Sequence, residues 1–261
     1  MIEIPIKIVS NKSVNADTFL LRLYSPELAA TAKPGQFVMV RVSDSIDPAL
    51  RRPFSICGTE DGNVIKILYK IVGKGTRILS AKKEGEFISV LGPLGKGFNI
   101  PERSKKTFYV AGGIGIAPLL FLYQKTKLSD ITFLTGFRTS SEIIDTALTG
   151  DNIENLIATD DGSMGHNGLV TDLLAEYLEK FKQNDMRIFT CGPLPMLRAV
   201  RDVSLKYNTP CQVSMETFMA CGLGACQGCV VRSNTGADTS YLHVCKEGPV
   251  FDINELDWGN I

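Results

Sequence analysis

The chain has 261 residues, and its 28 lysine and arginine residues are balanced by 28 aspartate and glutamate residues. A chain without net charge, and without a run of basic residues interleaved with aromatic ones, is not expected to bind nucleic acid or an anionic membrane. The first ten residues lack the pattern of a signal peptide, and the longest nearly uncharged stretch, residues 108–123, is too short to span a bilayer comfortably, so the cytoplasm is the expected location.

Residues 1–100 show short runs of β-forming residues separated by turn signals. The first run alternates isoleucine with polar residues or proline, the period-two pattern of a half-buried strand: Ile2, Ile4, Ile6 and Ile8. Further runs cover residues 18–25, 36–42, 53–57, 64–72 and 86–92. Short strands without long helices predict a β-barrel or a β-sandwich.

Residues 101–210 alternate between strand and helix. Strands are expected at residues 106–113, 131–137, 155–160 and 186–193, and helices at residues 116–125, 140–148, 170–181 and 194–207. This alternation predicts a doubly wound parallel sheet that binds ligands at the carboxyl ends of its strands. We expect the domain boundary near Pro101. After Pro210 the alternation stops, so residues 211–261 are expected to form a small third unit.

Four of the seven cysteines have the spacing of a plant-type [2Fe-2S] site: Cys221, Cys226, Cys229 and Cys245. Glycine and alanine residues between them allow backbone N–H groups to approach the cluster sulfides. A structural zinc site is the alternative, although zinc sites usually use two short cysteine pairs. The other three stand alone and are expected to be buried: Cys57, Cys191 and Cys211.

Two motifs in the β-rich half indicate a nucleotide site. The segment Arg52-Pro53-Phe54-Ser55 places a guanidinium, an aromatic ring and a hydroxyl at the beginning of a strand. The segment Gly73-Lys74-Gly75-Thr76 is a glycine-rich turn before a short helix at residues 77–83, with Thr76 as its expected N-cap. Free N–H groups at a helix start suit a pyrophosphate, and Arg52 would complete the clamp.

In the α/β half, a glycine-rich turn joins a strand directly to a helix through Gly112, Gly113 and Gly115. It differs from the G-x-G-x-x-G fingerprint, but it allows the same tight turn and close approach of a ligand. The segment Cys191-Gly192-Pro193 ends the last strand of the same sheet. Both turns are therefore expected to face one crevice, where a nicotinamide nucleotide would bind.

In this order, residues 52–55, 112–115 and 191–193 resemble the three signatures of the ferredoxin-NADP reductase superfamily. Residues 215–229 and 244–251 closely resemble the electron-transfer subunits of class B dihydroorotate dehydrogenase. The resemblance covers essentially the whole chain and implies a Greek-key FAD-binding barrel, an NAD-binding α/β domain and a C-terminal [2Fe-2S] domain on the four cysteines. It implies FAD contacts for Arg52, Pro53, Phe54, Ser55, Tyr69, Lys70, Ile71, Gly75 and Thr76.

The resemblance also implies a partner and a path for electrons. A separate subunit would oxidise (S)-dihydroorotate on FMN in pyrimidine (UMP) biosynthesis, and electrons would pass through the cluster to FAD and then to NAD+. The family pattern is a heterotetramer of two catalytic and two electron-transfer chains. We expect no catalytic residue for dihydroorotate here, because no part of the chain is left for the (β/α)8 barrel of about 250 residues that an FMN site would need.

Two other functions stay open at this stage. Related subunits of sulfhydrogenases and of NADH-dependent ferredoxin:NADP oxidoreductases share much of the pattern, so an independent NAD(P)H-dependent iron–sulfur flavoprotein reductase is the first alternative. A non-enzymatic, zinc-bearing interaction module is the second. No clear motif decides between NAD and NADP, although the resemblance favours NAD.

Several polar residues have two interpretations. Glu216 could lie near the flavin or the nicotinamide, but a solvated or hydrogen-bonded structural carboxylate is favoured. Residues 160–163 could contact a ribose, but a solvated turn is favoured. His166 and His243 are expected to be ordinary polar residues, because the four cysteines complete the cluster site. An exposed apolar rim around residues 219–225 would suit docking of another subunit.

Overall fold

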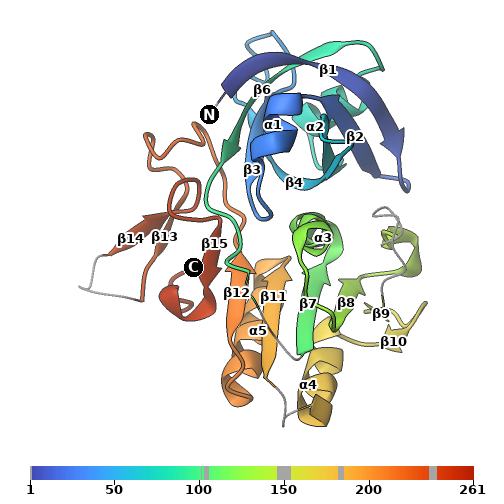
Figure 1. Ribbon diagram of the computed structural model, residues 1–261, viewed down its shortest axis with the longest axis vertical. Coiled ribbons are helices and arrows are strands. Elements are labelled where there is room, and N and C mark those ends of the chain that lie inside the picture. Colours follow the sequence, from blue (N-terminus) through green and yellow to red (C-terminus); the bar gives the residue numbers. More distant parts are fainter. Residues whose placement is uncertain (1, 101, 103–105, 146–153, 182–184, 235–239) are drawn as a thin grey trace.

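The computed structural model of the chain describes residues 2–100, 102, 106–145, 154–181, 185–234 and 240–261. Two sheets and a smaller C-terminal segment make up the fold, with the barrel at the top of Figure 1 and the second sheet below it. The expected boundary at Pro101 lies outside the described residues.

The N-terminal sheet is a closed barrel of six antiparallel strands in the order β1-β2-β5-β4-β3-β6. The strands are β1 (Ile2–Ser13), β2 (Thr18–Tyr24), β3 (Phe37–Arg41), β4 (Arg52–Glu60), β5 (Val64–Lys70) and β6 (Phe87–Leu94). Ile6 and Ile8 are fully buried inside the barrel, as their alternation with polar residues requires. The predicted barrel is therefore confirmed, and the sandwich alternative is wrong.

The second sheet has seven strands in the order β10-β9-β8-β7-β11-β12-β15. All of its neighbouring strands are parallel except β15, which runs antiparallel to β12. The strands are β7 (Lys106–Gly112), β8 (Ile131–Phe137), β9 (Asn155–Thr159), β10 (His166–Asn167), β11 (Met186–Cys191), β12 (Cys211–Ser214) and β15 (Val250–Asp252).

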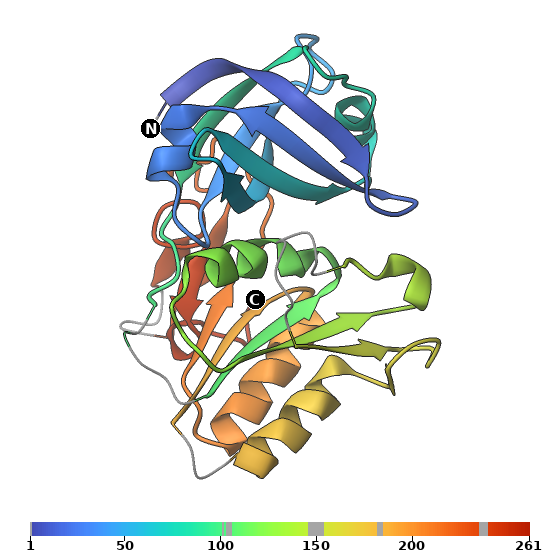
Figure 2. The same cartoon turned by 45° about the vertical axis from the view of Figure 1, so that its right-hand side comes forward.

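Helices cover both faces of this sheet. Helix α3 (Ile116–Lys125) lies between the sheet and the barrel, while α4 (Val170–Phe181) and α5 (Leu194–Lys206) cover the opposite face (Figures 1 and 2). The chain starts at β7, winds outward through β8 and β9, and then returns to β11 on the other side of β7. The predicted doubly wound sheet is therefore confirmed.

The longest described helix has 13 residues, and none of the described helices could cross a membrane.

Three local expectations differ from the structure. The helix expected at residues 140–148 is only a 3-10 turn, η2 (Ser140–Glu142), followed by irregular backbone up to residue 145, and the rest of that range lies outside the described residues. Helix α2 (Lys74–Ser80) begins three residues earlier than expected. Its N-cap is Gly73, so the N-cap role expected for Thr76 is wrong. A short helix that was not expected, α1 (Pro26–Thr31), follows β2 and is capped by the hydroxyl of Ser25.

The C-terminal region is rooted in the α/β sheet, because β12 pairs with β11 and β15 pairs with β12. Between β12 and β15 the chain makes an excursion, residues 215–249, which we call the cluster segment. It contains a two-stranded ribbon of β13 (Val230–Arg232) and β14 (Tyr241–His243). The cluster segment packs against β3 of the barrel, where a Cβ on Gly222 would come within 2.7 Å of Met39 Cγ.

Candidate functional site

A cavity of about 310 Å³, the barrel cavity, opens between the barrel and the start of the cluster segment. Seven of the residues expected to contact FAD line it: Arg52, Pro53, Phe54, Ser55, Tyr69, Lys70 and Thr76. The expected contact Ile71 does not line the cavity; its backbone N–H instead donates to the carbonyl oxygen of Asp17. Gly75 also lies outside the lining.

Aromatic side chains form one wall of the barrel cavity. The ring of Tyr69 stacks on Phe19 at 5.7 Å and meets the edge of Phe54 at 5.6 Å, measured between ring centroids. The Tyr69 hydroxyl donates to Asn11 Oδ1 at 3.0 Å, and burial raises the pKa of Tyr69 to about 12. This wall is therefore rigid, apolar and uncharged, which suits a flat aromatic ligand.

Gly75 explains how Arg52 reaches the cavity. A Cβ on Gly75 would lie 2.9 Å from Arg52 Nε, so the guanidinium packs directly over the backbone at the start of α2. The Thr76 hydroxyl turns back and accepts hydrogen bonds from the N–H groups of Val72 and Gly73, at 2.9 and 3.2 Å. The glycine-rich turn therefore shapes a seat for Arg52, and Thr76 stabilises the turn.

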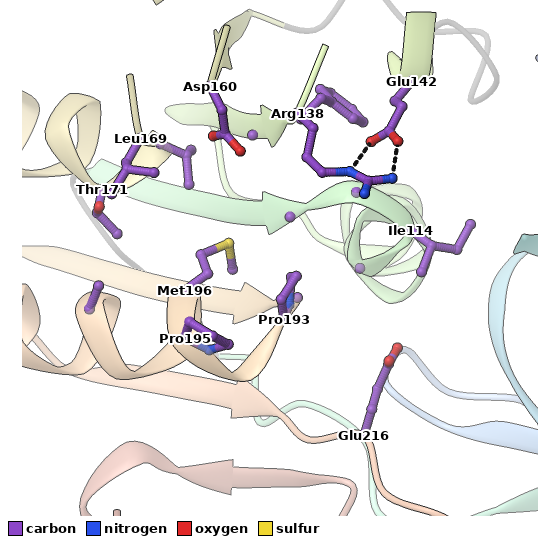
Figure 3. A pocket seen from close by; sticks show the side chains of 18 of the residues that line it. Ile114, Arg138, Glu142, Asp160, Leu169, Thr171, Pro193, Pro195, Met196 and Glu216 are labelled. Carbon is purple, nitrogen blue, oxygen red and sulfur yellow. Dashed lines mark hydrogen bonds and ion pairs between the residues drawn. The ribbon is translucent and has the colours of Figure 1, made fainter. Parts of the chain in front are cut away.

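A second cavity, the sheet cavity, has a volume of about 460 Å³ and lies at the carboxyl ends of β7, β8 and β11 (Figure 3). The structure brings the two expected turns into contact here, because a Cβ on Gly112 would lie 2.7 Å from Pro193 Cδ. Five expected residues line it: Gly112, Gly113, Gly115, Gly192 and Pro193. Cys191 is fully buried beneath them. This is the switch point of the doubly wound sheet, where such folds bind nucleotides.

The two cavities share three lining residues: Lys70, Ile114 and Glu216. Glu216 projects into the space between them, so its carboxylate is accessible from the cavities although protein encloses the site (Figure 3). This enclosure raises the pKa of Glu216. Among the described residues the carboxylate has no hydrogen-bond partner, and Glu216 is exposed, so of the two forms of the favoured structural carboxylate, solvated or hydrogen-bonded, the structure is compatible with the solvated one. A ligand in one cavity would meet a ligand in the other at this point.

An ion-pair network joins the barrel to the α/β unit beside this junction. Lys70 Nζ lies 3.1 Å from Asp17 Oδ2 and 3.4 Å from Glu142 Oε1. Arg138, at the end of β8, also pairs with Glu142 (Figure 3). The Arg138 guanidinium is the largest cause that lowers the pKa of Glu142, and Lys70 adds to the effect. Lys70 therefore serves first as a bridge between the two units.

The four predicted metal ligands come together as two pairs. The thiol of Cys221 neighbours that of Cys226, and the thiol of Cys229 neighbours that of Cys245. Within the described ranges no three histidine, cysteine or acidic side chains converge on one point. In a [2Fe-2S] cluster each iron takes two protein thiolates, so two adjacent pairs fit this cluster.

Backbone N–H groups point at these sulfurs. The N–H of Leu223 donates to Cys221 Sγ at 3.3 Å and lowers the pKa of Cys221 to about 6. The N–H of Gly224 donates to Cys245 Sγ at 3.0 Å. Burial, together with the neighbouring thiol of Cys229, raises the pKa of Cys245 to about 12, and iron binding would displace its proton. The donor set and the N–H groups suit an anionic cluster.

Three sequence families match successive parts of the chain. An oxidoreductase FAD-binding domain matches residues 5–98, an oxidoreductase NAD-binding domain matches residues 109–202, and the iron–sulfur cluster binding domain of dihydroorotate dehydrogenase B matches residues 216–257. The dihydroorotate dehydrogenase B (NAD(+)) electron transfer subunit of Desulforamulus reducens is 37% identical over 256 residues, which is 97% of both chains. The corresponding subunit of Clostridium acetobutylicum is 41% identical over 230 residues, 86% of both chains. The chain belongs to this family of electron transfer subunits.

A solved structure supports the same relationship. The structure of an NADH-dependent reduced ferredoxin-NADP oxidoreductase, described for flavin-based electron bifurcation, superimposes with a TM-score of 0.82 and 29% identity, covering 97% of this chain and 90% of the other. As a dihydroorotate dehydrogenase B electron transfer subunit, the chain is an oxidoreductase component with FAD-, NAD- and iron–sulfur-binding domains. The zinc-bearing interaction module is therefore wrong.

Sequence reasoning missed two residues of the sheet cavity in this electron transfer subunit. Arg138 and Glu142 follow β8, at the edge of the sheet where ligands bind, and their position after a strand was the available signal. Asp160 follows β9 at the same edge and had been considered as a ribose contact. Asp160 lines the cavity, whereas the carboxylate of Asp161 is occupied by the N–H and hydroxyl of Ser163, so the expected solvated turn describes only part of this segment. His166 and His243 do not line either cavity.

Proposed function

We propose that the chain carries electrons from an FMN-containing catalytic subunit to NAD+, as part of dihydroorotate oxidation in pyrimidine biosynthesis. (S)-Dihydroorotate would lose two electrons and two protons to become orotate. NAD+ would take up both electrons and one proton, and the other proton would go to solvent. A flavin supplies the conversion between single electrons from a cluster and the hydride of a nicotinamide. This chain would hold those groups in series and would not bind dihydroorotate.

One observation carries the proposal: a continuous piece of chain walls both cavities and leads into the cysteine loop. Glu216 borders both cavities, and Met219 lines the barrel cavity two residues before Cys221. Two residues span at most about 7 Å, so the Cα atom of Cys221 lies within about 7 Å of the Cα atom of Met219, which lines the barrel cavity. A flavin in the barrel cavity would therefore have the nicotinamide on one side and the cluster on the other.

Residue roles follow from this arrangement. In the proposal, Tyr69 and Phe54 pack against the flavin ring and Arg52 holds the FAD pyrophosphate. Gly112, Gly113, Gly115, Gly192 and Pro193 form the floor on which the nicotinamide nucleotide lies. Cys221 and Cys226 hold one iron of a [2Fe-2S] cluster, and Cys229 and Cys245 hold the other.

The partner belongs to the proposal as well. The curated relatives are named electron transfer subunits, which supports a separate catalytic chain. We propose that this chain contains FMN and that two copies of each chain form a heterotetramer. We also propose a cytoplasmic location, because all seven cysteines are free thiols, as expected in a reducing compartment.

Co-purification with the candidate catalytic subunit tests the proposal. The expected complex contains one FAD, one FMN and two irons for each pair of chains. Dihydroorotate should bleach the cluster absorption only when the catalytic subunit is present, and NADH should bleach it in either case. A complex that fails to form, or a cluster that dihydroorotate never reduces, would show that the donor is wrong.

An independent NAD(P)H reductase is the second candidate, favoured by the similarity to the NADH-dependent reduced ferredoxin-NADP oxidoreductase structure. In that case NADH alone would drive electron transfer from the isolated chain to a ferredoxin at a high rate. The presence of the dihydroorotate-oxidising subunit would then change nothing.

A further inference from the structure

The side chain of Asn11, on strand β1, connects three separate segments of the barrel. Its amide nitrogen donates to the carbonyl oxygens of Leu79 at 2.8 Å and Lys82 at 3.1 Å. Its amide oxygen accepts a hydrogen bond from the Tyr69 hydroxyl at 3.0 Å. These partners lie 58 to 71 residues away along the sequence. One half-buried side chain therefore ties β1 both to β5 and to the end of helix α2.

The partners fix which way the Asn11 amide points. A carbonyl oxygen can only accept hydrogen bonds, so the NH2 group must face Leu79 and Lys82. The amide oxygen is then left for Tyr69, whose hydroxyl can donate to it. A carboxylate at this position would place an oxygen against the two carbonyl oxygens. The set of partners therefore suits an amide, which combines two donors with an acceptor.

Helix α2 lies between Asn11 and the seat of Arg52. Leu79 belongs to its last turn, where carbonyl groups lack partners within the helix, and Asn11 supplies a side-chain donor there. The first turn of the same helix carries Thr76, which lines the barrel cavity, and Gly75, over which Arg52 packs. The helix has seven residues, a length of about 10 Å, so its position at the Asn11 end also sets its position at the Arg52 end.

The third hydrogen bond of Asn11 holds a ring of the aromatic wall. Tyr69 lines the barrel cavity and is only 1% exposed, and a buried tyrosine hydroxyl needs a hydrogen-bond partner. Phe19 and Phe54 pack against the ring, but only a hydrogen bond can fix how far the ring reaches along its own axis. Asn11 therefore acts on two parts of the cavity at once, the aromatic wall and the helix that seats Arg52.

We propose that Asn11 is a positioning residue for FAD, which holds Tyr69 and α2 at the separation that the flavin requires. This inference rests on the proposed assignment of FAD to the barrel cavity. A site binds more tightly when the groups that contact the ligand are fixed before binding, because less conformational freedom is then lost. Asn11 acts through Tyr69 and α2 and not through contact with the flavin.

FAD titrations of the full chain, with its cluster present and its flavin removed, test the role of Asn11. Asn11→Leu has a similar size and removes all three hydrogen bonds. It should raise the FAD dissociation constant, measured by flavin fluorescence, about tenfold, which corresponds to about 1.4 kcal/mol. The visible absorption bands of the bound flavin should also shift, because the Tyr69 ring no longer has a fixed position beside it.

Gln124→Leu is the matched control. The Gln124 amide also ties a helix to a barrel strand, because it accepts from the N–H of Thr59 at 2.9 Å and donates to the carbonyl oxygen of Thr59 at 2.6 Å. Gln124 is absent from the described linings of both cavities. This variant should therefore lower the melting temperature while FAD affinity and the flavin spectrum stay as in the wild type.

Tyr69→Phe keeps the test decisive even if Asn11→Leu does not fold. It removes only the hydroxyl that Asn11 binds and keeps the ring, so we expect FAD binding to weaken about threefold with the same spectral shift. In a Tyr69→Phe background, Asn11→Leu should weaken FAD binding by a smaller factor than in the wild type, because the hydrogen bond between the two residues is already lost.

The possible results separate the inference from the function on which it rests. A wild-type chain that does not bind FAD overturns the assignment of FAD to the barrel cavity. Unchanged FAD constants and spectra in Asn11→Leu and Tyr69→Phe overturn the positioning role alone. An equal loss of FAD affinity in Gln124→Leu overturns it as well, because general loosening of the fold would then be the cause. Fully additive losses in the double variant would show that Asn11 does not act through Tyr69.

Discussion

Lys70 of the barrel and Glu142 of the α/β unit form an ion pair, with 3.4 Å between Nζ and Oε1, beside the junction of the two cavities. Arg138 holds the same carboxylate. Partners from both units thus meet on one half-buried carboxylate, and the contact fixes how the barrel faces the sheet.

Glu142→Gln should therefore destabilise the chain at neutral pH. Because the folded pKa of Glu142 is lowered, its contribution is present above the unfolded value of 4.5 and is lost as the pH falls through the folded value. We expect a loss of about 0.5–1 kcal/mol at neutral pH that disappears in acid. Thermal unfolding at both pH values measures it. Glu86→Gln, which breaks the Lys82–Glu86 pair within the barrel, should have a smaller effect, and an equal effect would argue against the bridging role.

Gly75→Ala should weaken FAD binding. The new Cβ would lie 2.9 Å from Arg52 Nε and would push the guanidinium off its seat. We expect a rise in the FAD dissociation constant of about tenfold, measured by fluorescence titration. Gly73→Ala is a close control two residues away, because Gly73 has extended backbone and nothing lies within 4 Å of its Cβ. Equal losses in both variants would mean that the turn, and not Arg52, is responsible.

Cys245→Ser should remove the cluster and leave the flavin. Cys245 forms a pair with Cys229, so its loss leaves one iron with a single thiolate, while the barrel cavity keeps its lining. Iron analysis and visible spectra should show loss of the cluster with FAD at about one equivalent. Cys57→Ala, which changes a buried lone cysteine, should keep both groups. Retention of two irons in Cys245→Ser would refute the ligand assignment.

Glu216→Gln should stabilise the chain at alkaline pH. Desolvation by the protein that encloses the cavities raises the folded pKa of Glu216 above 4.5, although the residue is exposed to the cavities, so its favourable contribution is complete below 4.5 and is lost as the pH rises through the folded pKa. The variant should melt at a higher temperature than the wild type at about pH 8, and the difference should shrink toward about pH 4.5. Glu84→Gln, at an exposed position, should show no such trend. A difference that does not depend on pH would contradict the assignment.

Phe218→Ser should weaken association with the catalytic subunit. Phe218 is 95% exposed in the cluster segment, three residues before Cys221, and it belongs next to the expected apolar rim that includes Leu223. Aromatic anchors at the centre of an interface contribute about 2 kcal/mol or more, so the dissociation constant should rise about thirtyfold. Calorimetry or co-purification measures the change at unaltered FAD and iron content. Tyr24→Ser, at a half-exposed position on β2, should have no effect.

Much of the α/β unit could be predicted because the sequence of each helix or strand carries its own pattern of apolar residues. Helices α3 and α4 and strand β8 have the expected bounds, since apolar periodicity runs uninterrupted between turn signals. Helix α1 has six residues and is too short to show a period, although Ser25 before Pro26 was a usable capping signal. Strands β13 and β14, with three residues each, give no pattern at all.

The residues of the site could likewise be predicted where their role depends on neighbours in the sequence, and could not where it depends on contacts between distant segments. The motifs around Arg52, Gly112 and the four cysteines were visible because their chemistry depends on neighbours in sequence. Glu216 was ambiguous because its significance depends on two cavities that meet only in three dimensions. The N-cap role expected for Thr76 was wrong because Gly73 fits the extended N-cap conformation and lets Thr76 bond back to the turn.

The register of β12 and β15 has a consequence for how such a chain could change over time. Ser214 and Val250 are directly opposite each other, so the cluster segment departs from the sheet and returns to it at a single rung. A segment that starts and finishes at one point can be lengthened, exchanged or deleted without shifting any other strand. The barrel and the α/β sheet could therefore keep their structure while different electron-transfer segments are inserted at this position.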